Sequence, residues 1–161
     1  MLNIGDKAPD FLLEDHETKK YSLNNFKGKY IVLYFYPKDN TPGCTIEAVD
    51  FSSLKKEFEK KNSVILGISK DSCFSHKKFI KNKNLIITLL SDPEAQVQKA
   101  YDVWKPKKFL GKEFLGTIRT TFLINPKGEI KKIWNDVSVT NHAQEVLNEI
   151  KKLKLLSHKR E

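Results

Sequence analysis

Cysteine is scarce in this sequence: only Cys44 and Cys73 occur among 161 residues. Two cysteines cannot build the disulfide framework of a small secreted domain, so the sequence favours a reducing compartment, and we expect the protein in the cytoplasm. The first residues also lack the basic start and apolar core of a secretory signal. The longest apolar runs, residues 30–36 and 86–90, are far shorter than the ~20 residues of a membrane-spanning helix.

Arginine is scarce as well, because Arg119 and Arg160 are the only two among 29 basic residues. Lysine therefore carries most of the net charge of +9, and it is spread along the whole chain. No zinc-finger spacing, RNA-binding motif or helix-turn-helix pattern accompanies it, so the charge indicates solvated outer faces and neither a nucleic-acid nor a membrane partner. An arginine placed inside an apolar segment of such a lysine-rich chain indicates that the guanidinium itself is needed there.

Apolar periodicity predicts one α/β domain. Segments rich in β-branched and aromatic residues alternate with predicted amphipathic helices, in the first of which Ala48, Phe51, Leu54 and Phe58 recur every three or four positions. Phe74, Phe79 and Ile80 are the apolar positions of the second predicted helix. The last two predicted strands flank Asn125-Pro-Lys-Gly128, which is typical of a hairpin turn. The predicted strands span residues 30–36, 63–69, 86–90, 117–124 and 129–135, and the predicted helices span 45–61, 72–83, a short segment opened by Pro93, and 140–155.

This order of elements is similar to a thioredoxin-like layout, with a mixed central sheet, helices on both faces and an N-terminal extension of about 29 residues. We expect residues 1–156 to form this single domain and residues 157–161 to be a frayed basic tail. The connection over residues 103–116, with two glycines and Pro106, is expected to be irregular. In such sheets reactive groups gather at the carboxyl ends of the strands, where loops lead into helices.

Cys44 follows the most apolar predicted strand and stands at the start of a long predicted helix. The unpaired amide groups and the positive dipole end of a helix start favour a thiolate, which is the reactive form of cysteine. The residues before it, Thr41-Pro-Gly43, do not fill cores; they make turns and offer backbone amides and a hydroxyl. A small buried thiol is the alternative, and the sequence favours a nucleophile over it.

Thr41 and Pro37 each have a functional and a purely structural interpretation. A tight turn at Pro42-Gly43 brings the Thr41 hydroxyl near the Cys44 sulfur, while a helix N-cap also explains a threonine at this position. Pro37 either shields the thiol from one side or simply ends the preceding strand.

Arg119 lies in a predicted strand that is otherwise apolar, and a half-buried guanidinium needs an anionic partner. The Cys44 thiolate and Glu47, one helical turn further along, are the natural candidates. We hypothesise that Glu47 holds Arg119 in place while Arg119 stabilises the thiolate and an incoming polar substrate. An arginine facing solvent at a sheet edge, or a structural ion pair, is the alternative.

The segment Pro37-Lys-Asp-Asn-Thr41-Pro-Gly-Cys44 resembles the active-site pattern of the peroxiredoxin family: proline, three residues, threonine or serine, two residues, and the peroxidatic cysteine. With Glu47 and Ala48 following, it is similar to the peroxiredoxin Q subfamily, also called bacterioferritin comigratory protein. The resemblance covers nearly the whole chain. It continues through Ala8-Pro-Asp-Phe11, Gly67-Ile-Ser-Lys-Asp71, Ser75-His76, Ser91-Asp-Pro93 and Ile118–Ile124.

The resemblance implies a thioredoxin-type fold and an antioxidant enzyme that reduces hydrogen peroxide and organic hydroperoxides with thiols, without metal or bound cofactor. Cys44 would become a sulfenic acid while Thr41, the helix-start amides and Arg119 hold the peroxide. The subfamily includes monomers, so a monomer or weak dimer is expected. By resemblance the catalytic residues are Pro37, Thr41, Cys44 and Arg119, supported by Gly43 and Glu47.

The second cysteine departs from the subfamily pattern. Many members carry a resolving cysteine five residues after the peroxidatic one, where this chain has Val49, and others carry it in the next helix, where this chain has no cysteine around Ile80. Cys73 is then the only internal partner. A disulfide needs Cα atoms within roughly 7 Å, so one helix start would have to unwind. The sequence favours a one-cysteine mechanism with an external thiol, such as thioredoxin, glutaredoxin or a small thiol, and leaves an atypical Cys44–Cys73 disulfide as the alternative.

Two other classes of protein are less consistent with the sequence. A disulfide reductase would need a second cysteine where Glu47 stands. A metal-binding or non-catalytic thiol protein remains an alternative, because Cys73-Phe-Ser-His76 has ligand spacing and Cys44 offers a third donor. A closed zinc site needs four ligands, and the other histidines are scattered, so we expect His76 on a helix surface.

Overall fold

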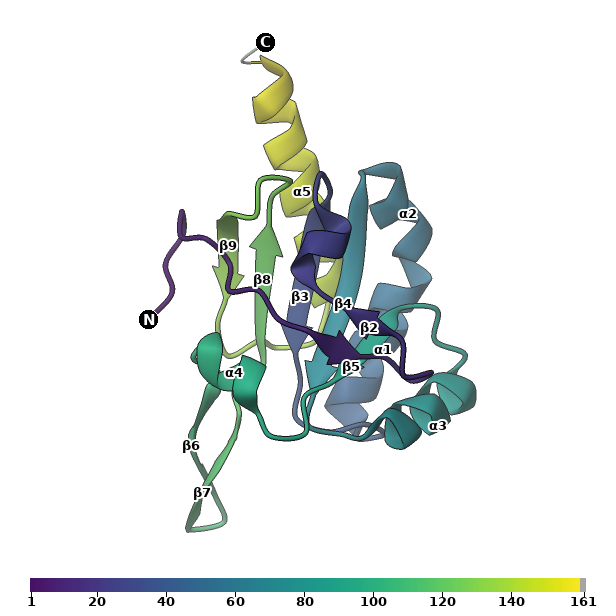
Figure 1. Cartoon of the computed structure of the whole chain (residues 1–161), viewed down its shortest axis with the longest axis vertical. Helices are drawn as coiled ribbons and strands as arrows, with labels where there is room; N and C mark the ends of the chain where they lie inside the picture. The colour runs from purple at the N-terminus through teal and green to yellow at the C-terminus, as the bar shows by residue number, and fades with distance from the viewer. Residues whose placement is uncertain (160–161) are drawn as a thin grey trace.

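A computed structural model describes residues 1–159 of the chain (Figure 1). The strands are β1 (Leu13–Glu14), β2 (Lys20–Tyr21), β3 (Tyr30–Phe35), β4 (Ser63–Ser69), β5 (Thr88–Ser91), β6 (Trp104–Phe109), β7 (Lys112–Thr117), β8 (Thr120–Ile124) and β9 (Ile130–Trp134). The helices are the 3₁₀ turn η1 (Leu23–Phe26), α1 (Pro42–Ser53), α2 (Lys55–Lys60), α3 (Cys73–Lys83), α4 (Gln96–Ala100) and α5 (His142–Lys159).

Seven of the described strands form one mixed sheet in the order β2-β1-β5-β4-β3-β8-β9. The neighbours β3, β4 and β5 are parallel, and the remaining pairs are antiparallel. The predicted thioredoxin-like α/β fold with a mixed sheet is confirmed. Among residues 1–159 the structure has no helix long and apolar enough to span a membrane.

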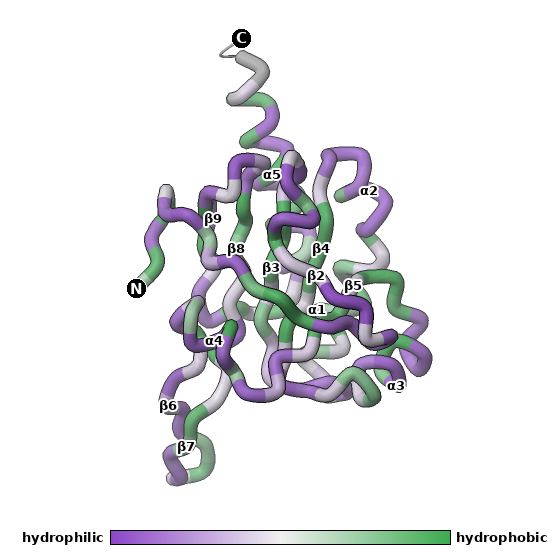
Figure 2. The backbone as a smooth tube through the Cα atoms, in the orientation of Figure 1, coloured by the Kyte–Doolittle hydropathy of each residue, from purple (hydrophilic) through white to green (hydrophobic). Residues whose placement is uncertain are grey.

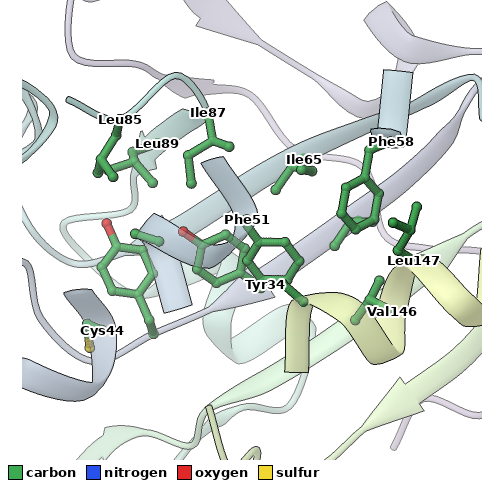
Figure 3. Close-up of a cluster of buried hydrophobic side chains, with 14 of the residues drawn as sticks. Tyr34, Cys44, Phe51, Phe58, Ile65, Leu85, Ile87, Leu89, Val146 and Leu147 are labelled. Atoms are coloured by element: carbon green, nitrogen blue, oxygen red, sulfur yellow. The ribbon is translucent and has the colours of Figure 1, made fainter. Parts of the chain in front are cut away.

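The central strand β3 is buried on both faces. Val32 and Tyr34 point into one apolar cluster, and Ile31, Leu33 and Phe35 point into the other. Helices α1, α2, α3 and α5 supply the first cluster, part of which Figure 3 shows with Cys44 at its margin. The second face is covered by α4, η1 and the N-terminal segment, which crosses the sheet in Figure 1. Figure 2 shows the matching hydropathy, with apolar central strands and polar outer helices.

The N-terminal extension reaches both edges of the sheet. Near its start, the Gly5 amide donates to the Ile130 carbonyl on β9. Further along, β1 pairs with β5 through Glu14 and Ser91. The extension therefore contributes strands and covering side chains to the domain.

The predicted helix over residues 45–61 is two helices. It begins earlier than expected, at Pro42, because proline is well suited to the first helical position, where no amide donor is needed. It then breaks at Leu54, whose φ of −98° and ψ of 2° are not helical. Just before the break the Ser53 hydroxyl donates to the Asp50 carbonyl, a local bond that competes with the helical pattern.

The prediction of an irregular connection over residues 103–116 was wrong. This segment contains β6 and β7, which pair antiparallel from Trp104–Thr117 to Phe109–Lys112 and form a hairpin that projects from the domain (Figure 1). The predicted strand over 117–124 is also interrupted, because Ile118 and Arg119 separate β7 from β8. Arg119 therefore lies in a short break between strands and not inside a strand.

Smaller differences concern single elements. Phe74 is exposed and not an apolar-face residue, because α3 turns His76 and Phe79 to the core instead. The third strand begins at Thr88, and the short helix after Pro93 begins only at Gln96. Helix α5 extends to Lys159, into the segment predicted to be frayed, whose residues 160–161 lie outside the described part of the chain.

A substitution at Gly67 tests how tightly the apolar cluster around Val32 and Tyr34 is packed. A Cβ atom at this position of β4 would lie 2.7 Å from Tyr34 Cζ and 2.8 Å from Leu89 Cδ2. We expect Gly67→Ala to lower the free energy of unfolding by about 1–3 kcal/mol, because neither neighbour can move freely. Urea denaturation measures this change.

The matched control is Gly116→Ala in the projecting hairpin. Its Cβ would lie 2.9 Å from Lys107 Cδ, which belongs to a flexible side chain that can move away. An equal loss of stability in both variants would contradict the packing described here.

Candidate active site

The cysteine and arginine that lie 75 residues apart in sequence meet because β3 and β8 are neighbours. Their register pairs Phe35 with Thr120, so the end of β3 lies beside the start of β8. The chain leaves β3 through residues 36–41 and begins α1, which carries Cys44 in its first turn. Arg119 directly precedes β8. The predicted position at the carboxyl end of the central strands is therefore confirmed for Cys44.

Arg119 forms a fork between two acidic groups of α1. Its Nη2 donates to the Cys44 sulfur at 3.2 Å, and its Nη1 donates to Glu47 Oε1 at 2.6 Å. Cys44 and Glu47 are three residues apart in a helix, so both side chains face the same way. The Glu47 side chain is fully buried, and that of Arg119 is 16% exposed. The structure thus brings together the three residues of the sequence hypothesis.

Burial and charge act in opposite directions on this cluster. Burial raises the pKa of Glu47 to about 7, and Arg119 opposes that rise through its charge and hydrogen bond. Burial alone would lower the pKa of Arg119, but Glu47 and Cys44 outweigh it, so the pKa is raised and the guanidinium stays charged. A permanent positive charge therefore lies against the sulfur in a place that water reaches poorly.

Gly43 allows this approach. A Cβ at Gly43 would lie 3.3 Å from Arg119 Nη2, which is tighter than an ordinary contact. A glycine just before Cys44 therefore lets the guanidinium lie close to the first turn of α1.

Thr41 stands at the N-cap position of α1, where its carbonyl accepts from the Thr45 amide. Its hydroxyl donates to the Lys38 carbonyl at 2.7 Å and caps no helix amide. The contact with the Cys44 sulfur suggested by the sequence is absent from the hydrogen bonds of residues 1–159. Pro37 lies two residues after the end of β3 and is half-buried.

Cys73 is the first residue of α3 and is partly buried, and both cysteines are unpaired thiols. Burial raises the pKa of Cys73, and the nearby carboxylates Glu14 and Asp15 raise it further. No cation comparable to Arg119 is among the groups that shift it within the described chain. The two thiols therefore have opposite electrostatic surroundings.

The expectation that His76 lies on a helix surface was wrong. Its ring is fully buried, with Nδ1 2.7 Å from Asp39 Oδ2 and Nε2 3.0 Å from the Leu90 carbonyl. The alternative of a metal site formed by Cys44, Cys73 and His76 is also wrong. Among residues 1–159 the only group of side chains close enough to share a metal ion is Asp39, Asp71 and His76, and it includes no cysteine. The sequence analysis missed these two aspartates, and the only sequence signal was that both follow predicted strands.

A cysteine sulfur held by an arginine, at the first turn of a helix on a thioredoxin-like sheet, defines a thiol-based redox protein. Residues 4–133 match the model of the AhpC/TSA family. The chain is 47% identical to peroxiredoxin Bcp of Bacillus subtilis, over 93% of this chain and 96% of that protein. It is 39% identical to peroxiredoxin Bcp of Escherichia coli, over 93% and 96%.

Solved structures agree with these sequence relatives. PrxQ of Xylella fastidiosa superposes with a TM-score of 0.91 at 38% identity, covering 96% of this chain and 98% of that one. The bacterioferritin comigratory protein of Xanthomonas campestris gives 0.84 at 39% identity, over 88% and 90%. The chain belongs to the AhpC/TSA family. Within it the chain is a peroxiredoxin of the Bcp and PrxQ type, a thiol peroxidase that reduces peroxide with electrons from a thiol.

His142 is a buried residue at the start of α5 that feels the charge of Arg119. Its Nε2 shares a hydrogen bond of 2.8 Å with the Thr121 hydroxyl, and the edges of Phe51 and Trp134 contact its ring. Burial lowers the pKa of His142 to about 4, and the charge of Arg119 adds to that effect. The imidazole is therefore neutral at physiological pH.

This neutral histidine predicts a pH dependence of stability. The unfolded chain binds a proton at His142 below about pH 6.5, whereas the folded chain does so only near pH 4, so folding stability from this group falls as the pH drops from 6.5 to 4. We expect the wild type to lose about 1–2 kcal/mol relative to His142→Gln across that window. Urea midpoints at both ends of the window measure it.

Comparing the wild type with His142→Gln cancels the contributions of other titrating groups to the pH dependence of stability. Glu47 has a raised pKa and therefore acts in the opposite direction, adding stability as the pH falls through 7, but it does so in both proteins. A constant stability difference between wild type and His142→Gln from pH 7 to pH 4 would contradict a buried neutral histidine.

Proposed function

We propose that Cys44 is the peroxidatic nucleophile and that the enzyme reduces hydrogen peroxide and organic hydroperoxides by a one-cysteine mechanism. The observation that carries this proposal is the fork of Arg119, whose guanidinium lies 3.2 Å from the Cys44 sulfur and is fixed by Glu47 at 2.6 Å. A thiolate is the reactive species, and a charged hydrogen-bond donor at its sulfur favours it over the thiol.

In the first step the Cys44 thiolate attacks the terminal oxygen of the peroxide. The S–O bond forms as the O–O bond breaks, so sulfur is oxidised to a sulfenic acid and the peroxide is reduced. The leaving alkoxide or hydroxide takes up a proton and departs as alcohol or water. Negative charge moves from sulfur to that leaving oxygen, and Arg119 stabilises the charge along this path.

The other proposed site residues bind the peroxide around Cys44. The unpaired amides of the first turn of α1, which Gly43 leaves open, offer donors to the peroxide oxygens. Thr41 offers its hydroxyl from the N-cap position, exchanging its bond to the Lys38 carbonyl for one to the peroxide. Pro37 bounds the site at the end of β3 and lacks an amide that would compete for the peroxide.

The proposed substrates include organic hydroperoxides because of what is described for a relative. The Xanthomonas campestris protein, with the same fold at 39% identity, is described by its alkyl peroxide reduction activity. That similarity supports, for this chain, a site that accepts peroxides with an organic substituent as well as hydrogen peroxide.

We propose that an external thiol, from thioredoxin, glutaredoxin or a small thiol, reduces the sulfenic acid. Its attack releases water and leaves a mixed disulfide, and a second thiol then frees Cys44. The raised pKa of Cys73 supports an external thiol, because Cys73 is poorly ionised and weakly nucleophilic. The Cys44–Cys73 disulfide is the alternative. Such reductants occur in the cytoplasm, which is the proposed place of action for a monomer or weak dimer.

Two cysteine variants test the assignment. Cys44→Ser is expected to abolish peroxide consumption, because a hydroxyl does not form the oxidisable anion. Cys73→Ser is expected to keep the first turnover within about twofold of the wild-type rate, since Cys73 takes no part in peroxide attack. Stopped-flow mixing of reduced protein with hydrogen peroxide measures both, and peroxide consumption at the wild-type rate by Cys44→Ser would refute the assignment.

Arg119→Lys tests the fork itself. A single ammonium keeps the charge but cannot donate to Cys44 and Glu47 at once, so we expect the second-order rate constant with peroxide to fall about 100-fold. Glu47→Gln is the comparison variant: it keeps a hydrogen-bond acceptor for Arg119, and we expect a smaller loss of about tenfold. A rate within about twofold of wild type in Arg119→Lys would show that charge alone suffices.

A further inference from the structure

The loop before α1 is fastened through Asp39. The Asp39 side chain is almost completely buried, and both of its oxygens accept hydrogen bonds. Tyr36 donates its hydroxyl to Oδ1 at 2.6 Å, and Ser75 donates its hydroxyl to Oδ2 at 2.8 Å. The backbone amide of Asp39 donates to Asp71 Oδ2 at 2.9 Å. A residue in the middle of this loop is thus held by the residue that follows β3, by α3 and by the loop before α3.

His76 completes this network through both of its ring nitrogens. The Leu90 carbonyl can only accept, so the His76 Nε2 that faces it at 3.0 Å carries a hydrogen. Nδ1 lies 2.7 Å from Asp39 Oδ2, and that short contact also needs a hydrogen between the two atoms. Both ring nitrogens of His76 therefore face an acceptor, and the ring connects the Asp39 carboxyl group to the Leu90 carbonyl inside the core.

The cluster of Asp39, Asp71 and His76 is a hydrogen-bond network and not a metal site. Both Asp39 oxygens already accept from side chains, and Asp71 Oδ2 accepts from the Ser69 hydroxyl at 2.7 Å as well as from the Asp39 amide. A cation at this cluster would have to displace these donors from Oδ2 of both aspartates.

The network reaches the reactive sulfur through the backbone. Asp39 is two residues before Thr41, the N-cap residue of α1, and Asn40 between them has a φ of 60°, in the left-handed region that asparagine tolerates in turns. The position of Asp39 therefore fixes where the first turn of α1 begins, and with it the place of Cys44 against Arg119.

We propose that Asp39 and His76 are positioning residues of the peroxidase reaction: the buried pair fixes the loop over residues 37–41 and so keeps Cys44 in contact with Arg119. This inference rests on the proposed function of Cys44. When the pair is broken, the first turn of α1 loosens, the sulfur loses its charged donor, and the thiolate is less stable and slower to attack peroxide.

Two substitutions of His76 separate its two contacts. The side-chain amide of asparagine replaces Nδ1, so His76→Asn keeps a donor toward Asp39, whereas the longer glutamine replaces Nε2, so His76→Gln keeps the donor toward the Leu90 carbonyl only. Asp39→Asn removes the charge without changing the shape. The control is Ser72→Ala, which deletes the N-cap hydroxyl that accepts from the Ser75 amide and weakens the start of α3 without touching Asp39.

The experiment measures the Cys44 thiol pKa from thiolate absorbance, in a Cys73→Ser background, together with the second-order rate constant with hydrogen peroxide. We expect His76→Gln and Asp39→Asn to raise that pKa by about one unit and to slow the reaction about tenfold. His76→Asn should remain within about threefold of the background rate, and Ser72→Ala should move only the unfolding midpoint.

The outcomes are distinguishable. If His76→Gln and Asp39→Asn lose stability like Ser72→Ala but keep the thiol pKa and the rate, the pair is merely structural and the proposal is overturned. If His76→Gln does not fold, Asp39→Asn and His76→Asn still decide between these results. If the parent protein with Cys44 intact consumes no peroxide, the proposed function fails instead, independently of the pair.

Discussion

The site depends on one guanidinium that contacts two acidic groups at once. Arg119 joins Glu47 at 2.6 Å and the Cys44 sulfur at 3.2 Å in a largely buried place. A buried cation without partners would be costly, so Glu47 keeps Arg119 charged and in position against the Cys44 sulfur. Gly43 follows from the same constraint, since a Cβ there would crowd the guanidinium.

The order of the strands brings Arg119 and Cys44 together. Because β3 and β8 are antiparallel neighbours, the end of β3 lies beside the start of β8. The loop that leads to α1 and the break that contains Arg119 therefore lie next to each other. On the opposite side of that loop, Asp39 and His76 connect it to α3. The Cys44 sulfur thus lies between two buried contacts, the ion pair of Arg119 with Glu47 that touches it and the Asp39–His76 contact in the loop that leads to it.

Patterns within one segment could be predicted from sequence, whereas partners across space could not. The strand over Ser63–Ser69 was predicted with the right bounds, and the local motif around Cys44 was enough to indicate the family. Pro106 lies inside β6 and Gly116 inside β7, and because both residue types are uncommon in strands, the sequence indicated an irregular connection instead of this hairpin. The burial of His76 and the break at Leu54 depend on distant neighbours and on competing local hydrogen bonds, neither of which periodicity records.

The most direct test is the intact mass of the reduced protein after one equivalent of hydrogen peroxide, with remaining thiols blocked by an alkylating reagent. A Cys44 thiolate that attacks alone predicts the gain of one oxygen at Cys44, with Cys73 still alkylated. The loss of two hydrogens with both thiols protected, at low protein concentration, would contradict the one-cysteine mechanism and make Cys73 the resolving residue. An unchanged mass would contradict the role of Cys44 itself.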